Sequence, residues 1–158
     1  MEGLLEGADH VDVHVMDGSG SVLDLSADIL SYRPGWMSAL WRVRVWLLRA
    51  LGQGERAVPG RHGWTGGTLP RCPGDQVGFF SVVRSDGKTH WIAEGKESHL
   101  EAVMAVCGTP LSDGQIRFSV VTVVRYHNMA GRIYFNVIKL FHHLVVHAAM
   151  RCALSGQG

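Results

Sequence analysis

Residues 76–154 constrain the fold more than any other part of the chain, because strand-like segments follow one another there without an intervening helix and end in one long helical segment. The apolar, strand-like runs cover 77–84, 89–94, 98–107 and 115–127. Asp86-Gly87, between the first two runs, is typical of a tight hairpin turn. Consecutive strands with short connections favour an antiparallel meander, and helices kept apart from them indicate an α+β fold.

One further strand and one long loop precede this region. Residues 10–16 alternate, so the valines at positions 11, 13 and 15 share one face while Asp12 and His14 share the other, which predicts a half-buried strand. Residues 52–75 hold seven of the 20 glycines, which predicts a long loop with a short strand near 62–65. The length and glycine content of this loop suggest a lid as its role.

Three helices are expected. Ser26 is the expected N-cap of the first. Trp36–Leu51 has helical length and is apolar around most of its circumference, with Gly52 as C-cap, so we expect this helix to be largely covered. The last helix runs from about Met129 to Leu154 with Asn128 as N-cap. Its expected core stripe consists of positions 134, 137, 138, 141, 145 and 148.

Composition excludes several classes of function. The 158 residues are expected to form a single domain, 1–158, with 46% hydrophobic residues available for its core. A net charge of +1 argues against nucleic-acid binding, which needs a basic surface. Three scattered cysteines indicate neither a disulfide framework nor a cysteine zinc site. The acidic first residues are unlike a signal peptide and no stretch of about 18 residues lacks charge, so we expect no membrane association and a cytoplasmic location.

Three separate motifs resemble a known family. They are Pro34-Gly35-Trp36-Met37 with Leu40 and Arg44, Ser98-His99-Leu100-Glu101, and His127-Asn128-x-x-Gly131-Arg132-x-Tyr134. Together they resemble an uncharacterised bacterial family of the START/polyketide-cyclase (SRPBCC) helix-grip superfamily, found alone or fused to short-chain-dehydrogenase-like domains. The resemblance implies a curved antiparallel sheet wrapped around a long C-terminal helix, with an internal pocket, and it implies no reaction. Glu101-Ala102 stand where the family usually has Asp-Phe, so the pocket is roomier here or is closed from elsewhere.

His127, Asn128 and Arg132 form the first candidate ligand site, at the junction of the last strand and the last helix. In a structural role, Asn128 caps the helix and Arg132 pairs with an acidic residue. In a functional role, the N–H groups at the helix start bind a carboxylate or a phosphate together with Arg132 and His127. The sequence leaves both roles open.

Glu97, His99 and Glu101 form the second candidate site. By the alternation of a strand, these three residues share one face. Acidic groups beside a histidine raise its pKa and orient it as a base. A solvent-exposed sheet face explains the pattern without any function. If the face is concave, Glu97 and His99 become the acid–base candidates.

Three histidines of the last helix raise the question of a metal site. His143 and His147 are four residues apart and share a helix face. Zinc needs a third ligand, and nothing in the sequence places one. We therefore expect no metal and no cofactor, and we interpret these two histidines, with His142, as the solvated side of the helix.

These observations favour a small-molecule-binding domain with a hydrophobic cavity between the sheet and the C-terminal helix. Trp36 is among the aromatic residues that could line it, and the expected ligand is hydrophobic or aromatic with an anionic group near Arg132 and His127. One alternative is a cyclase- or hydrolase-like enzyme that uses His99 or His127 as its base and Glu97 as the partner of that base. Another is a ligand-free accessory or dimerisation module, since the apolar girth of the helix at 36–51 is compatible with a homodimer.

Overall fold

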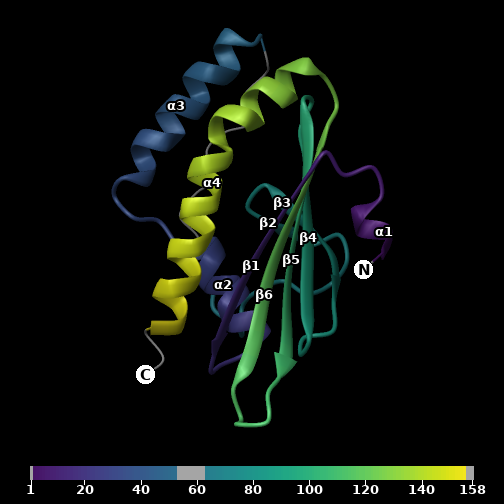
Figure 1. Cartoon of the computed structure of the whole chain (residues 1–158), viewed down its shortest axis with the longest axis vertical. Helices are drawn as coiled ribbons and strands as arrows, with labels where there is room; N and C mark the ends of the chain where they lie inside the picture. Colours follow the sequence, from purple (N-terminus) through teal and green to yellow (C-terminus); the bar gives the residue numbers. More distant parts are fainter. Residues whose placement is uncertain (1, 53–62, 156–158) are drawn as a thin grey trace.

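The computed structural model describes residues 2–52 and 63–155 (Figure 1). The helices in this part of the chain are α1 (Glu2–Leu5), α2 (Val22–Ser31), α3 (Met37–Ala50) and α4 (Met129–Ser155). The strands are β1 (His10–Gly18), β2 (Gln76–Val77), β3 (Phe80–Ser85), β4 (His90–Lys96), β5 (Leu100–Pro110) and β6 (Ile116–Tyr126).

The six strands form one antiparallel sheet in the order β1-β6-β5-β4-β3-β2. Strands β2 to β6 form the expected meander, and β1 pairs with β6 along its whole length, from His10 opposite Val124 to Gly18 opposite Ile116. Helices α2, α3 and α4 lie on one side of the sheet, and α1 lies on the other (Figure 1). The predicted α+β helix-grip architecture, a sheet that holds a long C-terminal helix, is confirmed.

Two clusters of buried side chains lie between the sheet and the helices. Trp91 and Phe118 are completely buried in the main core cluster, where burial of one such side chain stabilises the fold by about 1.5–3 kcal/mol. The indole N–H of Trp91 donates to the carbonyl oxygen of Pro70 at 2.9 Å, which satisfies its only polar atom. A second cluster joins Leu48 of α3 to Leu100 and Tyr134.

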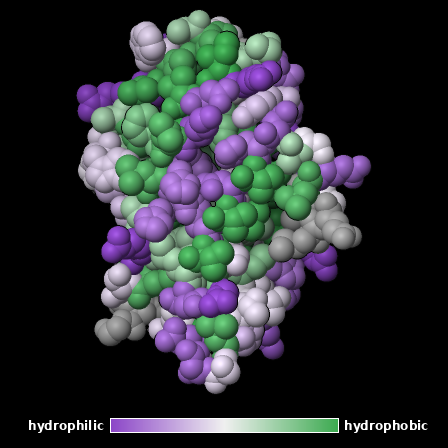
Figure 2. Space-filling model, in the orientation of Figure 1, coloured by the Kyte–Doolittle hydropathy of each residue, from purple (hydrophilic) through white to green (hydrophobic). Residues whose placement is uncertain are grey.

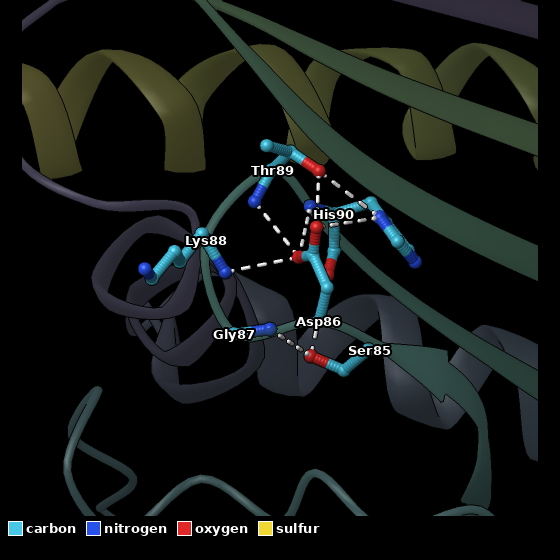
Figure 3. Close-up of polar contacts among 6 residues, drawn as sticks. All are labelled: Ser85, Asp86, Gly87, Lys88, Thr89 and His90. Carbon is cyan, nitrogen blue, oxygen red and sulfur yellow. Dashed lines mark hydrogen bonds and ion pairs between the residues drawn. The ribbon is translucent and has the colours of Figure 1, made fainter.

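The turn between β3 and β4 confirms the predicted hairpin (Figure 3). The Asp86 carboxylate accepts hydrogen bonds from the backbone N–H groups of Lys88, Thr89 and His90 at 2.8 to 3.0 Å, and from the Thr89 hydroxyl. The Thr89 hydroxyl and these N–H groups hold the pKa of Asp86 well below its usual value, because they stabilise the charged form. Gly87 takes the left-handed conformation, with φ of 73°, that the turn requires.

Alternation in β1 would be expected to bury its valines and expose its polar residues, and the structure shows the reverse. Its three valines, Val11, Val13 and Val15, are 43%, 52% and 53% exposed, whereas His14 is buried against α4. Asp12 and His14 both contact His143 of α4, a partner that could not be identified from the sequence of β1 alone. The valines lie on the sheet face away from α2, α3 and α4, and they pair with Val123, Val121 and Ser119 of β6.

The buried face of α4 also differs from the expected stripe. Tyr134 is buried as predicted, but Val137 and Phe141 are 44% and 43% exposed. The buried residues of α4 are Gly131, Tyr134, Phe135, Val146, Ala149, Met150 and Ala153. His142 is half-buried between the two halves of this set. A polar residue at an inward position conceals the true face from an argument based on apolar periodicity.

The other helices begin and pack differently from the prediction in two respects. The N-cap of α2 is Ser21, whose hydroxyl accepts from the N–H of Asp24, and Ser26 lies inside the helix, where its hydroxyl donates to the Val22 carbonyl. Helix α3 is not largely covered, because Leu48 is its one buried residue. The expected short strand at 62–65 begins outside the described residues, and residues 63–65 are not in a strand.

Apolar side chains remain exposed on α3 and α4, and Figure 2 shows such residues interspersed with polar ones over this face. On α4 they are Met129, Ile133, Val137, Leu140, Phe141 and Leu144. Among the described helices, α4 is long and apolar enough to cross a membrane by length and composition alone. A single helix of this kind is weak evidence for a membrane span, and α4 packs on β1, β6 and α2.

Candidate functional site

A polar cluster lies where the turn between β4 and β5 meets α3 and α4. Arg44 of α3 is its centre, since one guanidinium nitrogen donates to Glu97 Oε1 at 2.6 Å and another donates to the Tyr134 hydroxyl. Glu97 Oε2 lies 3.3 Å from His99 Nε2. The His99 ring packs edge-on against Tyr134, with 5.0 Å between ring centroids. We call Arg44, Glu97, His99 and Tyr134 the Arg44 cluster.

Local backbone contacts fix the turn that carries Glu97 and His99. The Glu97 N–H donates to the Leu100 carbonyl at 2.9 Å, which reverses the chain between β4 and β5. The Asn128 side chain joins this turn to α4, because its Nδ2 donates to the Ser98 carbonyl while its Oδ1 accepts the N–H of Gly131. Asn128 therefore caps α4, as predicted from the sequence.

His99 is buried without a hydrogen-bond partner. Its exposed fraction is 0%, and neither ring nitrogen makes a hydrogen bond in the described part of the molecule. Burial lowers the pKa of His99; the Glu97 charge opposes this effect, and the charges of Arg44 and His127 add to it. The ring is therefore neutral near pH 7, with one nitrogen able to donate and the other able to accept.

The positive charge of Arg44 is balanced by the Glu97 carboxylate and by two aromatic rings. Its guanidinium lies 5.5 Å from the Trp41 ring and 5.4 Å from the Tyr134 ring, in addition to its bond with Glu97. Burial raises the pKa of Tyr134, and the nearby Arg44 charge and its hydrogen bond oppose this rise. The Tyr134 hydroxyl is consequently protonated near pH 7 and is itself available as a donor.

A mainly apolar groove of about 350 Å³ runs beside the cluster, open to solvent. Its lining residues all belong to α3: Trp41, Arg42, Val45, Trp46 and Arg49. Trp41 belongs to the groove and also touches Arg44, so it connects the groove to the cluster. The groove therefore combines an apolar wall with two arginine side chains.

The structure brings together some of the predicted site residues and separates others. His127 joins the turn, because its Nδ1 lies 3.1 Å from the Glu97 carbonyl and its N–H donates to the His99 carbonyl. Arg132 is exposed on α4, with no side-chain hydrogen bond in the described residues to the Arg44 cluster. Trp36 is 42% exposed at the start of α3.

Glu101 does not share a face with Glu97 and His99, and this prediction was wrong. It pairs with Arg125 of β6 at 2.9 Å, on the strand face opposite that of Leu100. The alternation fails because β5 begins only at Leu100, so Glu97 and His99 belong to a turn and not to a strand.

Two residues of the cluster, Arg44 and Tyr134, were not proposed as site residues from the sequence. Both belong to the motifs on which the family resemblance rests, and those motifs come from three distant parts of the chain. Their convergence in space is the signal that could have identified the cluster, but it becomes visible only when the fold places α3 against α4.

A second group of polar side chains lies between β1 and α4. It adds Asp12 and His14 of β1 to the histidines of α4, for which the sequence indicated no further metal ligand. Asp12 Oδ2 is 3.0 Å from His14 Nε2 and 3.1 Å from His143 Nδ1. The adjacent His142 is half-buried, and burial lowers its pKa to about 4. The interpretation of His142 as a solvated residue was therefore wrong, whereas His143 and His147 are exposed as expected.

Comparison with known proteins identifies a family. A family model described as "Protein of unknown function (DUF2867)" matches residues 4–149. No curated protein sequence matches the chain.

Three solved structures are similar over most of the chain. A hypothetical protein, jhp0584, from Helicobacter pylori has 13% identity and a TM-score of 0.47, with coverage of 98% of this chain and 91% of that one. Ara h 8.0201 has 13% identity and a TM-score of 0.36, with coverage of 92% and 99%. Truncated norcoclaurine synthase from Thalictrum flavum has 14% identity and a TM-score of 0.32, with coverage of 92% and 91%. These likenesses carry no argument about the chemistry of this chain.

Proposed function

Because the chain belongs to the DUF2867 family, whose description assigns no function, we propose a function from its own geometry: it is a small-molecule-binding domain whose site lies beneath and beside α3. The ligand is a hydrophobic or aromatic molecule with an acidic group. Its apolar body occupies the α3 groove, and its polar end reaches the Arg44 cluster.

The observation that carries this proposal is the buried ring of His99, whose nitrogens make no hydrogen bond in the described part of the chain, although Nε2 lies 3.3 Å from Glu97 Oε2. A buried polar group that lacks a hydrogen bond costs about 1–3 kcal/mol, so such groups are uncommon in folded proteins. A ligand that donates to one ring nitrogen or accepts from the other removes this cost. His90 also has an unpartnered ring nitrogen, Nε2, but its Nδ1 contacts the Thr89 hydroxyl.

The weak packing of α3 supplies a route to His99. Only Leu48 of this helix is buried, so few apolar contacts hold it against the sheet and α4. The Arg44 bonds to Glu97 and Tyr134 are polar contacts that hold α3 over the cluster. An acidic ligand group competes with Glu97 for Arg44, which loosens the helix and exposes His99.

A fluorescent probe tests this proposal directly. 1-Anilinonaphthalene-8-sulfonate is an aromatic anion of the proposed class, and we expect one saturable site on the folded chain. Trp41→Ala and His99→Phe should each weaken binding at least about tenfold, since large aromatic anchors and buried polar partners dominate such sites. Native mass spectrometry of the freshly purified chain, compared with its denatured mass, would reveal a ligand acquired in the cell.

His90→Phe is the matched control, since it removes the other histidine with an unpartnered nitrogen, at the opposite end of β4. It should leave probe binding unchanged. Equal weakening by His90→Phe and His99→Phe, or binding that never saturates, would show adsorption to exposed apolar surface and would exclude the site.

A general acid–base function is a second candidate, and the contact of Glu97 with His99 favours it. A carboxylate 3.3 Å from an imidazole nitrogen can orient the ring and stabilise its protonated form. In that case the bound molecule is a substrate that loses a proton to His99. Time-dependent conversion of a ligand by the wild type, abolished in Glu97→Gln while binding persists, distinguishes this function from binding alone.

A further inference from the structure

The interior between β1 and α4 is polar at a position where sheet and helix normally exclude polar groups. β1 directs Asp12 and His14 inward and leaves its three valines in solvent, the reverse of the arrangement that burial of apolar surface favours. An inverted strand of this kind needs a compensating interaction on its inner face. The Arg44 cluster lies elsewhere, at the turn after β4, and among the described residues it makes no such interaction with β1.

We propose that Asp12, His14 and His143 form a binding site for a divalent transition-metal ion, of which Zn²⁺ is the fitting example. One ligand atom from each residue, Asp12 Oδ2, His14 Nε2 and His143 Nδ1, lies within 4.8 Å of the other two. The nitrogen–oxygen distances are 3.0 and 3.1 Å. With bonds of about 2.0–2.1 Å, a tetrahedral zinc ion separates its nitrogen and oxygen ligands by about 3.3 Å, so small side-chain movements suffice.

The donor set fits a transition metal better than a hard cation. Imidazole nitrogens suit zinc, copper and nickel, whereas calcium and magnesium prefer oxygen ligands. Two imidazoles and one carboxylate are a known three-ligand zinc set that leaves the fourth position open. The single negative charge of Asp12 partly balances the charge of the ion.

The three side chains differ in exposure, so the proposed site has a buried, fixed side and a side that is open to solvent. His14 is held by its surroundings, with 5% of its side chain exposed, and Asp12 has 18% exposed. His143 is on the solvent side, with 60% of its side chain exposed, so an ion and a water molecule can approach there. His147 lies one turn further along α4, its ring 6.1 Å from that of His14, close enough to supply a fourth ligand after a rotamer change.

The test is Zn²⁺ titration of the full chain, free of any histidine tag, by isothermal calorimetry. We expect one Zn²⁺ per chain and no binding of Mg²⁺. Co²⁺ should give the intense visible absorption of a tetrahedral site. His143→Ala should weaken Zn²⁺ binding at least about tenfold, and its exposed position means that the fold survives the change. Asp12→Asn, which retains the shape of the side chain, should weaken binding as well.

His90→Ala is the control for loss of a histidine elsewhere, and it should bind Zn²⁺ like the wild type. The alternative is that the three groups only hydrogen-bond to one another. In that case the wild type binds no Zn²⁺ at millimolar concentration, or binds it equally well after His143→Ala, and either result overturns the proposal. Because His143 is not part of the Arg44 cluster, neither result bears on the binding of the fluorescent anion.

Discussion

Gly131 of α4 lies directly against the backbone carbonyl of His99, so closely that a Cβ atom at position 131 would overlap this oxygen. The contact brings the start of the helix onto the turn that carries Glu97 and His99. Gly131→Ala must therefore push α4 away from the turn, and we expect it to destabilise the fold by about 1–3 kcal/mol, the range for overpacked sites. Urea unfolding measures this change.

Gly35→Ala is the matched control, since a Cβ at Gly35 meets nothing within 4 Å. Its effect should stay within about 0.5 kcal/mol. If both substitutions have the same small effect, α4 is not held against the turn by this contact.

Tyr134→Phe should destabilise the fold by about 1–2 kcal/mol, because it removes the hydroxyl that accepts from Arg44 and keeps the ring that packs on His99. Tyr126→Phe is the control, since no hydrogen bond of the Tyr126 hydroxyl occurs in the described residues. Chemical denaturation of both variants at neutral pH compares them. Equal stability losses would mean that Arg44 gains nothing from the Tyr134 hydroxyl.

Acid should destabilise the wild type more than His99→Phe. The folded pKa of His99 is depressed by burial, so as pH falls below about 6.5 the unfolded chain takes up a proton that the folded chain refuses. Stability is lost in this window, by up to about 1.4 kcal/mol per pH unit for this one group. Urea unfolding at about pH 7.5 and about pH 5 measures both proteins. Parallel losses in the two proteins would contradict the depressed pKa.

Asp86→Asn should lower Tm at neutral pH, because the charged acceptor of the β3–β4 turn is replaced by a neutral amide. The folded pKa of Asp86 lies below its unfolded value of about 3.9, so its contribution is present above that value and is lost as pH falls through the folded pKa. The difference in Tm between the two proteins should therefore shrink in strong acid. Asp113→Asn, which makes the same exchange at an acceptor of a single N–H, should have the smaller effect at neutral pH.

The fold class could be predicted from the sequence because its signals are local. The Asp86-Gly87 turn, the consecutive apolar runs and the Asn128 cap each act over a few residues, and the structure confirms them. The orientation of β1 and the buried face of α4 could not be predicted, for one shared reason. Both depend on polar residues at inward positions, His14 on the strand and His142 on the helix, and apolar periodicity assigns such residues to solvent.

The candidate site was only partly visible in the sequence for a different reason. Glu97 and His99 were singled out from the sequence. Arg44 lies 53 positions before Glu97 and Tyr134 lies 90 positions after Arg44, so only the packing of α3 on α4 brings these residues together. Glu101 was grouped with them on strand alternation, which fails where a turn replaces the strand. Position along a strand is thus a poor guide to a site built at its end.

Of the strands in this sheet, β1 is synthesised first, yet its only partner is β6, the last strand made. The meander from β2 to β6 can assemble hairpin by hairpin as it emerges, since each strand meets its predecessor after a short turn. β1 must wait, with its valines and its inward-facing polar groups both in water, until about 100 further residues exist. Helix α4 follows β6 directly, so the two elements that enclose Asp12 and His14 are both made after the rest of the sheet. The sheet is completed last at the strand that is made first.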